Sequence, residues 1–336
     1  MRILQLPTEI AGQVNLTARG LRAIGYDALS ATKPNPLGYP TEINSCFKRL
    51  PFLKDTRNPL LFFSWARDFD LFHYHKSPYL PMGIDVRYLK RNDRPFFIEF
   101  WGSDIRLYDL ERARNPYFEL DNASNQQRKL DRLKFWSEMT NEVIMSDNSA
   151  DIFLKPYFET IHVVRQRVDT ARYQPVFPDP ENPRPKILHA PSVEGIKGTE
   201  HVEKAINQLE QKQLHFDYVR VQDVPHAKAM KMYAEADIIV DQLRMGSYGM
   251  LSCEAMALGK PVICYILDEL LDTYPDGFPV VNANPDTVTE VLEALVLSPQ
   301  KRHEIGRQGR RYVEKVHDIK EVAKRLVRIY EANMHR

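Results

Sequence analysis

The sequence predicts an α/β protein with two doubly wound, Rossmann-like domains. Short apolar segments typical of strands alternate with amphipathic segments typical of helices along most of the chain, which is the pattern of parallel strands joined by crossover helices. A polar stretch at 173–185 contains five prolines, and proline favours extended backbone and lacks an N–H donor, so this stretch is predicted to be an interdomain linker. A chain of 336 residues is long enough for two domains that each bury a core.

Residues 1–172 are predicted to form the first domain. Apolar runs bounded by polar or turn-forming residues predict its strands at 2–6, 71–74, 96–100, 142–145 and 161–164. Helical spacing of apolar residues predicts helices at 14–24, 81–91 and 126–138. A parallel sheet with helices on its faces is therefore expected for the first half of the chain.

Residues 186–318 show the same alternation and are predicted to form the second domain. Strands are expected at 186–189, 216–220, 237–240, 262–265 and 279–281. Helices are expected at 200–211, 226–235, 251–258, 285–297 and 299–314. A last amphipathic helix is expected at 319–333, within the C-terminal segment 319–336.

The stretch from Gly246 to Val262 is the most informative part of the sequence. A turn of small residues follows a strand-like run and leads into a short helix that carries Glu254. Such a turn directs free backbone N–H groups and the positive end of a helix toward one point, which suits a phosphate, and Glu254 is placed to accept hydrogen bonds from sugar hydroxyls beside it. The pattern predicts a nucleotide-sugar site. The alternative is an ordinary strand–loop–helix unit in which Gly249 and Gly259 serve only turn and cap roles.

The run from Glu254 to Val262 resembles the donor-site motif of the retaining GT-B glycosyltransferases of family 4, which ends Glu-Ala-Met-Ala-x-Gly-x-Pro-Val. That motif usually begins Glu-Gly-Phe-Gly; here Gly246 stands at the first glutamate position, so the sugar pocket is expected to gain room beside Tyr248. The resemblance implies the GT-B architecture, in which two Rossmann-like domains face each other across a cleft and the last helix, here 319–336, returns to the first domain. It also implies donor contacts from Ser247, Tyr248, Gly249, Met250, Leu251 and Glu254.

Two further turns are predicted to contact the donor. Lys197-Gly198 resembles the family's Gly-Arg-Leu-x-x-x-Lys-Gly loop, which implies that Lys197 binds the donor pyrophosphate and has a catalytic role in stabilising it as a leaving group. Ser192 stands at the arginine position, and a solvated lysine at a turn is the alternative for Lys197. Gly12 and Gln13 follow the first strand, where the family has a glycine-rich loop that faces the donor diphosphate; the alternative is a simple strand-to-helix turn.

The segment 97–106 resembles the family's Thr-x-His-Gly-x-Asp segment at the end of a first-domain strand. Gly102 and Asp104 match the family, whereas Trp101 occupies the histidine position. Asp104 is predicted to be catalytic or, alternatively, to cap the next helix. Trp101 is predicted to stack on a sugar face on the acceptor side, and His75, at the end of another strand, is predicted to contact the acceptor.

His73 and His75 share one face of their strand, so a metal-binding pair is an alternative for these residues. No third ligand is evident nearby in the sequence, and the resemblance implies no essential metal and no cofactor other than the nucleotide sugar itself. Arg165 and Arg167 precede the predicted linker. They are predicted either to supply charge to a phosphate or to lie on the surface.

The composition favours a cytoplasmic protein. The net charge of +1 gives no sign of a broad nucleic-acid-binding surface, and Cys46, Cys253 and Cys264 are odd in number and far apart, as expected for thiols in a reducing compartment. The N-terminus does not resemble a signal peptide, and no apolar run approaches the roughly 20 residues that span a bilayer. Residues 46–54 mix basic and apolar side chains, which predicts peripheral contact with the inner membrane surface; the alternative is a loop whose aromatic residues enter the core.

The resemblance implies a retaining glycosyltransferase that moves a sugar from a nucleoside diphosphate sugar to a hydroxyl of a glycan, a lipid-linked molecule or a small molecule. Retention is expected from attack on the same face from which the phosphate departs. Gly246, Ser192 and Trp101 replace three polar family positions, so a nucleotide-sugar-binding protein without turnover is an alternative. A nucleotide-sugar epimerase is another, although the sequence identifies no acid and base carboxylates for it.

Overall fold

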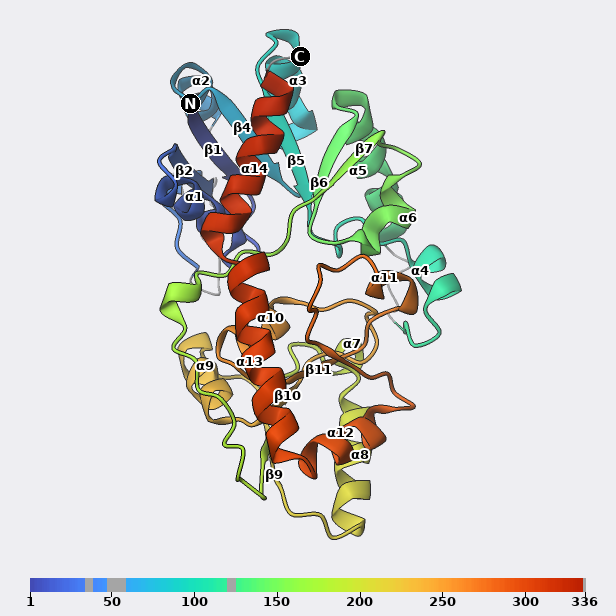
Figure 1. Ribbon diagram of the computed structural model, residues 1–336. Helices are drawn as coiled ribbons and strands as arrows, with labels where there is room; N and C mark the ends of the chain where they lie inside the picture. The colour runs from blue at the N-terminus through green and yellow to red at the C-terminus, as the bar shows by residue number, and fades with distance from the viewer. Residues whose placement is uncertain (34–38, 47–58, 120–124, 335–336) are drawn as a thin grey trace. The chain divides into compact units, whose positions relative to one another are not determined.

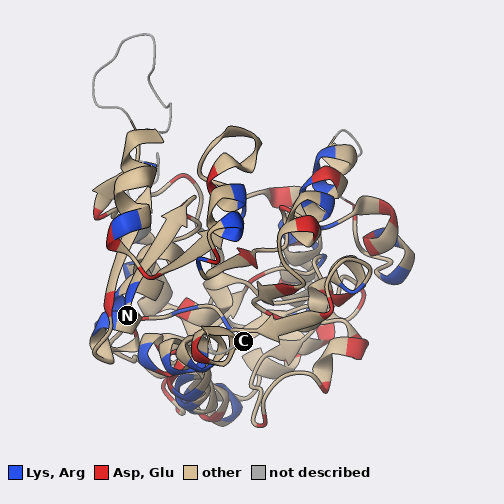
Figure 2. Ribbon diagram, turned by 90° about the horizontal axis from the view of Figure 1, so that it is seen from above, with Lys and Arg blue, Asp and Glu red and all other residues tan. Residues whose placement is uncertain are grey.

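A computed structural model describes residues 1–33, 39–46, 59–119 and 125–334 (Figure 1). The chain divides into two compact units. Unit 1 consists of Met1–Leu107, Ala123–Arg167 and Ile319–Arg336, and unit 2 consists of Tyr108–Asn122 and Val168–Asp318. Figure 2 shows Lys and Arg interspersed with Asp and Glu along the ribbon.

Unit 1 contains a seven-stranded parallel sheet in the order β3-β2-β1-β4-β5-β6-β7. The strand order reverses beside β1, which pairs with both β2 and β4, so the topological switch point lies between β1 and β4. Its elements are β1 (Arg2–Pro7), α1 (Gln13–Ala23), β2 (Asp27–Thr32), β3 (Ile43–Asn44), α2 (Pro59–Asp68), β4 (Leu71–His75), η1 (Pro81–Gly83), α3 (Ile84–Arg91), β5 (Phe96–Phe100), α5 (Gln126–Met139), β6 (Glu142–Met145), η3 (Asn148–Ala150), α6 (Asp151–Leu154), β7 (Thr160–Val163) and α14 (Ile319–Met334).

Helices cover both faces of this sheet, which explains why all five residues of β4 are buried. One face packs against α1 and α14. At their contact, a Cβ atom on Gly20 of α1 would lie 2.4 Å from the carbonyl oxygen of Ile319, so only glycine allows this approach. The α14 residues that face the core recur at helical spacing and include Val322, Leu326 and Tyr330.

Unit 2 contains a five-stranded parallel sheet in the order β12-β11-β10-β8-β9. Because β8 pairs with β9 on one side and with β10 on the other, the switch point lies between β8 and β10. Its elements are α4 (Tyr108–Arg114), η4 (Thr170–Arg172), β8 (Lys186–His189), α7 (Glu194–Lys197), α8 (Thr199–Gln211), β9 (Asp217–Arg220), α9 (His226–Glu235), β10 (Ile238–Val240), α10 (Met250–Ala257), β11 (Val262–Cys264), α11 (Asp268–Leu271), β12 (Val281–Asn282), α12 (Val288–Val296) and α13 (Pro299–Val316).

The two parallel sheets confirm the predicted α/β fold class, while several elements differ from the prediction. The strands β2 and β3 and the helices α2 and α4 were not predicted. The predicted helix at 81–91 is divided into η1 and α3, because Gly83 adopts a left-handed conformation with φ of 67°. The predicted helix at 285–297 begins only at Val288, because the Asn284 side chain accepts the backbone N–H groups of Asp286 and Thr287 in a preceding turn.

The proline-rich stretch 173–185, predicted to be a linker, packs on unit 2. The N–H of Val176 donates to the carbonyl of Leu258 at 2.9 Å, and His303 Nδ1 lies 2.9 Å from the carbonyl oxygen of Pro178. The first domain was predicted to extend to residue 172, whereas unit 1 ends at Arg167 in this region and Tyr108–Asn122 belongs to unit 2. Within the described ranges, no helix combines the length and apolarity needed to cross a bilayer.

Candidate functional site

The predicted donor residues, apart from Gly12 and Gln13 in unit 1, lie at the topological switch point of unit 2. In open parallel α/β sheets, ligands bind beyond the carboxyl ends of the strands where the strand order reverses. Here β8 ends at His189 and β10 ends at Val240. The segment after β8 carries Lys197, and the segment after β10 runs through 241–249 into α10.

Asp241 joins these two segments. Its carboxylate is fully buried, and Oδ1 accepts a hydrogen bond from Lys197 Nζ at 2.6 Å while Oδ2 accepts one from Ser252 Oγ at 2.6 Å. Burial by itself raises the pKa of Asp241, but the Lys197 ammonium and its hydrogen bonds outweigh burial and lower the pKa below the ordinary value. Neither Asp241 nor Ser252 was predicted from the sequence, although Asp241 shortly precedes the motif and Ser252 lies within it.

Lys197 is held in place rather than solvated at a turn. Its Nζ also donates to Gln242 Oε1 at 3.0 Å, and the side chain is only 13% exposed. An ammonium has three donors, so two are directed to Asp241 and Gln242 and one remains for another acceptor. The predicted pyrophosphate contact of Lys197 stays a prediction, and the geometry leaves a donor for it.

The loop that leads into α10 is tightly packed at Gly246. This residue has φ of 73°, and a Cβ atom there would lie 2.6 Å from Leu267 Cγ. The expected extra room at the missing glutamate position is therefore absent, because Leu267 fills it. Next to Gly246, the carbonyl oxygen of Ser247 accepts a hydrogen bond from Gln242 Nε2, which fixes the turn.

The Tyr248 side chain points into the core instead of toward a ligand. It is 3% exposed, its hydroxyl lies 3.1 Å from His317 Nε2, and its ring packs on Tyr274 and Phe278. A donor contact from Tyr248 would therefore come from its backbone. This corrects the expectation of a sugar pocket beside its ring.

The first turn of α10 carries the remaining predicted donor residues. Gly249 precedes the helix in an extended conformation and offers no side chain to cap it, while Met250 and Leu251 are half-buried. The N-terminus of a helix favours anions, and the Asp241 carboxylate accepts the N–H of Gly249 at this point. Glu254 lies one turn further along, half-buried, and its Oε1 accepts a hydrogen bond from the Tyr173 hydroxyl at 3.3 Å.

The first turn of α1 in unit 1 already contains an internal anion. The Glu9 carboxylate accepts the N–H groups of Ile10 at 2.8 Å and of Val14 and Asn15 at 3.2 Å each. Burial raises the pKa of Glu9, and these N–H bonds oppose that rise. The helix N-terminus predicted to face the donor diphosphate is thus occupied by the chain's own carboxylate.

Gly12 and Gln13 have structural partners in the same turn. Gly12 adopts φ of 81° before α1. The buried Gln13 side chain donates from Nε2 to the carbonyl of Arg167 at 3.0 Å and accepts the N–H of Arg167 at 2.7 Å. Their donor contact stays a prediction, while the observed bonds attach β1's loop to the segment after β7.

Asp104 closes a turn instead of capping the next helix. Its Oδ1 accepts the backbone N–H of Trp101 at 3.0 Å, and the buried carboxyl group has a raised pKa, chiefly because of desolvation. Trp101 in turn donates from Nε1 to His75 Nδ1 at 3.3 Å, and their rings are stacked with centroids 5.9 Å apart. His75 is fully buried, so it does not offer the direct acceptor contact that was predicted for it. Trp101 is half-buried.

A buried ion pair lies beneath Trp101. Arg167 Nη1 and Nη2 donate to the two oxygens of Glu99 at 2.5 and 2.9 Å, and both side chains are almost fully buried. Neither role predicted for Arg167 holds, because it is not a surface residue and its guanidinium faces a carboxylate. Glu99 Oε2 also lies 3.3 Å from His73 Nε2 and 3.5 Å from His75 Nδ1, which brings together three side chains of metal-ligating type.

The protonation states of this cluster follow from burial and charge. Burial raises the pKa of Glu99, but Arg167 and the imidazoles outweigh it and lower the pKa to about 2. Burial lowers the pKa of both His73 and His75, so the imidazoles are neutral. Arg167 already neutralises the Glu99 carboxylate, and the indole of Trp101 already donates to His75. The charges of the cluster therefore balance within unit 1.

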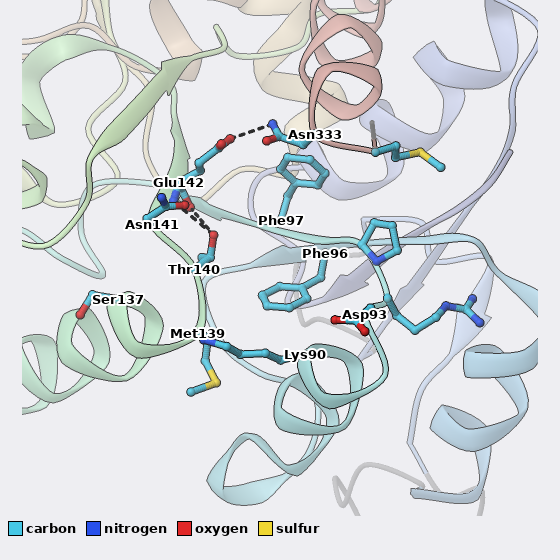
Figure 3. A pocket seen from close by; sticks show the side chains of 13 residues that line it. Lys90, Asp93, Phe96, Phe97, Ser137, Met139, Thr140, Asn141, Glu142 and Asn333 are labelled. Atoms are coloured by element: carbon cyan, nitrogen blue, oxygen red, sulfur yellow. Dashed lines mark hydrogen bonds between the residues drawn. The ribbon is translucent and has the colours of Figure 1, made fainter. Parts of the chain in front are cut away.

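A cavity of about 720 Å³ lies at the opposite end of the unit 1 sheet (Figure 3). Phe96 and Phe97 at the start of β5, Glu142 at the start of β6 and Asn333 near the end of α14 line it. The Asn333 amide donates to Glu142 Oε2 at 2.8 Å across its wall. None of the predicted site residues lines this cavity, and it lies away from the carboxyl ends of the strands.

Comparison with known proteins agrees with this arrangement. Residues 197–328, which contain the candidate donor site, match a family model described as glycosyl transferase-like. No curated protein sequence matches the chain. Sucrose-phosphate synthase from Thermosynechococcus elongatus has a similar structure, with a TM-score of 0.66 and 14% identity over 100% of both chains.

Two further solved structures show the same similarity. HepE from Anabaena in complex with UDP-glucose has a TM-score of 0.64 and 12% identity, with 99% of this chain and 100% of that chain covered. A glycosyltransferase from Rickettsia africae has a TM-score of 0.63 and 14% identity over 98% of each chain. The fold is that of the GT-B glycosyltransferases, and the predicted resemblance to them is confirmed.

Proposed function

We propose that this protein is a retaining glycosyltransferase that moves a sugar from a nucleoside diphosphate sugar to an acceptor hydroxyl. The observation that carries the proposal is the junction at Asp241, which holds Lys197 against the loop that opens α10 at the switch point of unit 2. An ammonium and the N-terminus of a helix at one place suit a diphosphate. The solved complexes of HepE with UDP and with UDP-glucose make uridine nucleotides the first donors to test.

The donor is proposed to bind through unit 2. The backbone N–H groups from Ser247 to Leu251 and the remaining donor of Lys197 hold the diphosphate, and Glu254 accepts the ribose hydroxyls. During transfer the bond between the anomeric carbon and the phosphate oxygen breaks, and the negative charge that develops on that oxygen is stabilised by Lys197. The acceptor oxygen forms its bond on the same face, and its proton passes to the departing phosphate.

The acceptor is proposed to contact unit 1 through Trp101. A half-buried indole whose N–H is already bonded presents apolar ring surface, which suits a sugar face. His75 accepts the indole N–H of Trp101, and Asp104 accepts its backbone N–H, so both residues act through Trp101. Transfer is proposed to need no metal or cofactor and to occur in the cytoplasm. The acceptor is a glycan, a lipid-linked molecule or a small molecule.

Acceptor-dependent release of nucleoside diphosphate tests this proposal. UDP-sugars and other nucleoside diphosphate sugars are incubated with the protein and a panel of glycoside acceptors, and free nucleoside diphosphate is measured. Transfer predicts release that requires an acceptor. Thermal stabilisation by the donor without release would instead favour the binding protein without turnover, for which the glycine at 246 is the specific observation. Conversion of the donor sugar in the absence of any acceptor would indicate an epimerase.

A further inference from the structure

The helices α2 and α3 of unit 1 each present an exposed stripe of apolar and basic residues. On α2, Leu60 is 75% exposed and Phe63 is 46% exposed, and Arg67 is exposed one turn further on. On α3, the exposed positions 84, 87, 88 and 91 have the spacing of one helix face. They hold isoleucine, arginine, tyrosine and arginine in that order.

These two stripes form one surface. The rings of Phe63 on α2 and Tyr88 on α3 pack edge to face with centroids 5.7 Å apart. The buried Phe62, also on α2, packs against Tyr88 with ring centroids 5.9 Å apart. Met82, in η1 immediately before α3, is 81% exposed. We refer to the apolar residues Leu60, Phe63, Met82, Ile84 and Tyr88, together with Arg67, Arg87 and Arg91, as the α2–α3 face. Figure 1 labels the two helices.

The α2–α3 face is positively charged, although the chain as a whole is nearly neutral. Arg67, Arg87 and Arg91 are exposed, whereas Asp68 at the end of α2 is the only exposed acid of these two helices. The single acid of α3, Asp85, is fully buried and accepts the N–H groups of Tyr79 and Leu80. Apolar side chains therefore project from a surface that attracts anions.

We propose that the α2–α3 face docks on an anionic membrane surface. Apolar side chains that project from helices enter the boundary between head groups and acyl chains, and tyrosine suits that boundary because one end of its ring is polar. Arginine stems cover apolar surface while their guanidinium groups reach anionic phosphates. This proposal does not depend on sugar transfer. The predicted membrane segment 46–54 lies, apart from Cys46, outside the described residues, and the proposal makes no use of it.

Vesicle sedimentation with the full chain tests the proposal. The protein is mixed with vesicles of phosphatidylcholine alone or of equal parts phosphatidylcholine and phosphatidylglycerol. We expect about tenfold or more stronger binding to the anionic vesicles at low salt, with loss of that preference at high salt. Absence of binding to anionic vesicles, or equal binding to both kinds, would overturn the proposal.

Paired variants locate the surface. Leu60→Ser with Met82→Ser removes two highly exposed apolar side chains, and Arg87→Gln with Arg91→Gln removes charge; each pair is expected to reduce anionic-vesicle binding at least about fivefold. Matched controls in unit 2 are Leu297→Ser, at a residue 62% exposed, and Arg307→Gln with Arg311→Gln on α13. Equal losses in the controls would overturn the assignment to α2 and α3. A protein that does not bind vesicles but dimerises with increasing concentration would also overturn the proposal, if Phe63→Ser abolished the dimer.

Discussion

At the scale of single residues, the Lys197 ammonium interacts with two anionic groups in the proposed function. It neutralises the buried Asp241, and in the proposed function it also contacts a diphosphate. A lysine paired with a buried carboxylate is well positioned, because it cannot leave without exposing an uncompensated charge to the interior. The same pairing reduces the net positive charge of the candidate site. The remaining attraction for phosphate then depends on the third ammonium donor and on the N-terminus of α10.

Lys197→Gln is expected to weaken nucleoside diphosphate binding about tenfold or more while leaving nucleoside binding nearly unchanged. Glutamine keeps an N–H donor for Asp241 but removes the charge that faces phosphate. Calorimetry with a nucleoside and its diphosphate measures the difference. Lys186→Gln, at the opposite end of β8, is the control and should change neither affinity. Equal loss of both ligands would show that Lys197 only supports the loop.

Glu99→Gln is expected to reduce the free energy of unfolding by about 3–5 kcal/mol at pH 7, because it leaves the Arg167 charge buried without a partner. The pKa of Glu99 is about 2 in the folded protein and 4.5 ordinarily, so the ionised carboxylate stabilises the fold fully above 4.5. That contribution is lost as the pH falls from 4.5 toward 2. Urea unfolding across this range should therefore show the free energy of unfolding of the wild type falling toward that of the variant. Glu321→Gln on the surface of α14 should differ little from wild type at any pH.

At the scale of elements, the loop between β10 and α10 differs from the usual donor-site motif in its packing at Gly246. The segment keeps the small residues that open the helix, but Leu267 occupies the position into which a side chain at Gly246 would extend. The left-handed backbone at Gly246 disfavours other residues as well. The loop is thus adapted to glycine, and a glutamate at 246 has no space in this packing.

Gly246→Glu is expected to destabilise unit 2 by about 1–3 kcal/mol through overpacking and to weaken nucleoside diphosphate binding by displacing the start of α10. Adding Leu267→Ala should recover part of the stability by making space. Thermal melts and donor turnover of the single and double variants test this. If the double variant transferred sugar and the wild type did not, the wild type would be a binding protein that lost its turnover with the glutamate.

At the scale of the whole molecule, the sequence was sufficient for what depends on short-range patterns. Alternating apolar runs predicted both parallel sheets, and the motif at 246–262 predicted the edge of unit 2 where the candidate site lies. What it could not predict depends on pairing between distant residues. Glu99 and Arg167 are 68 positions apart and Lys197 and Asp241 are 44 apart, so each looked like an isolated charge. The strand β2 was missed because its alanines and serine have weak strand preference, and pairing with β1 supplies its stability.

The two units also differ in how the first helix after a switch-point strand begins, and this difference predicts where a ligand protects the backbone. In unit 2 the Asp241 carboxylate, which is paired with Lys197, accepts the N–H of Gly249 before α10, whereas in unit 1 Glu9 accepts three N–H groups at the start of α1. Hydrogen–deuterium exchange with saturating nucleoside diphosphate should therefore slow at 193–198 and 242–254 and stay unchanged at 9–16. An anion entering the turn at Glu9 would have to displace a carboxylate that is held by three N–H groups, which costs free energy. Protection at 9–16 equal to that at 242–254 would contradict this assignment and would support the predicted donor contact of Gly12 and Gln13.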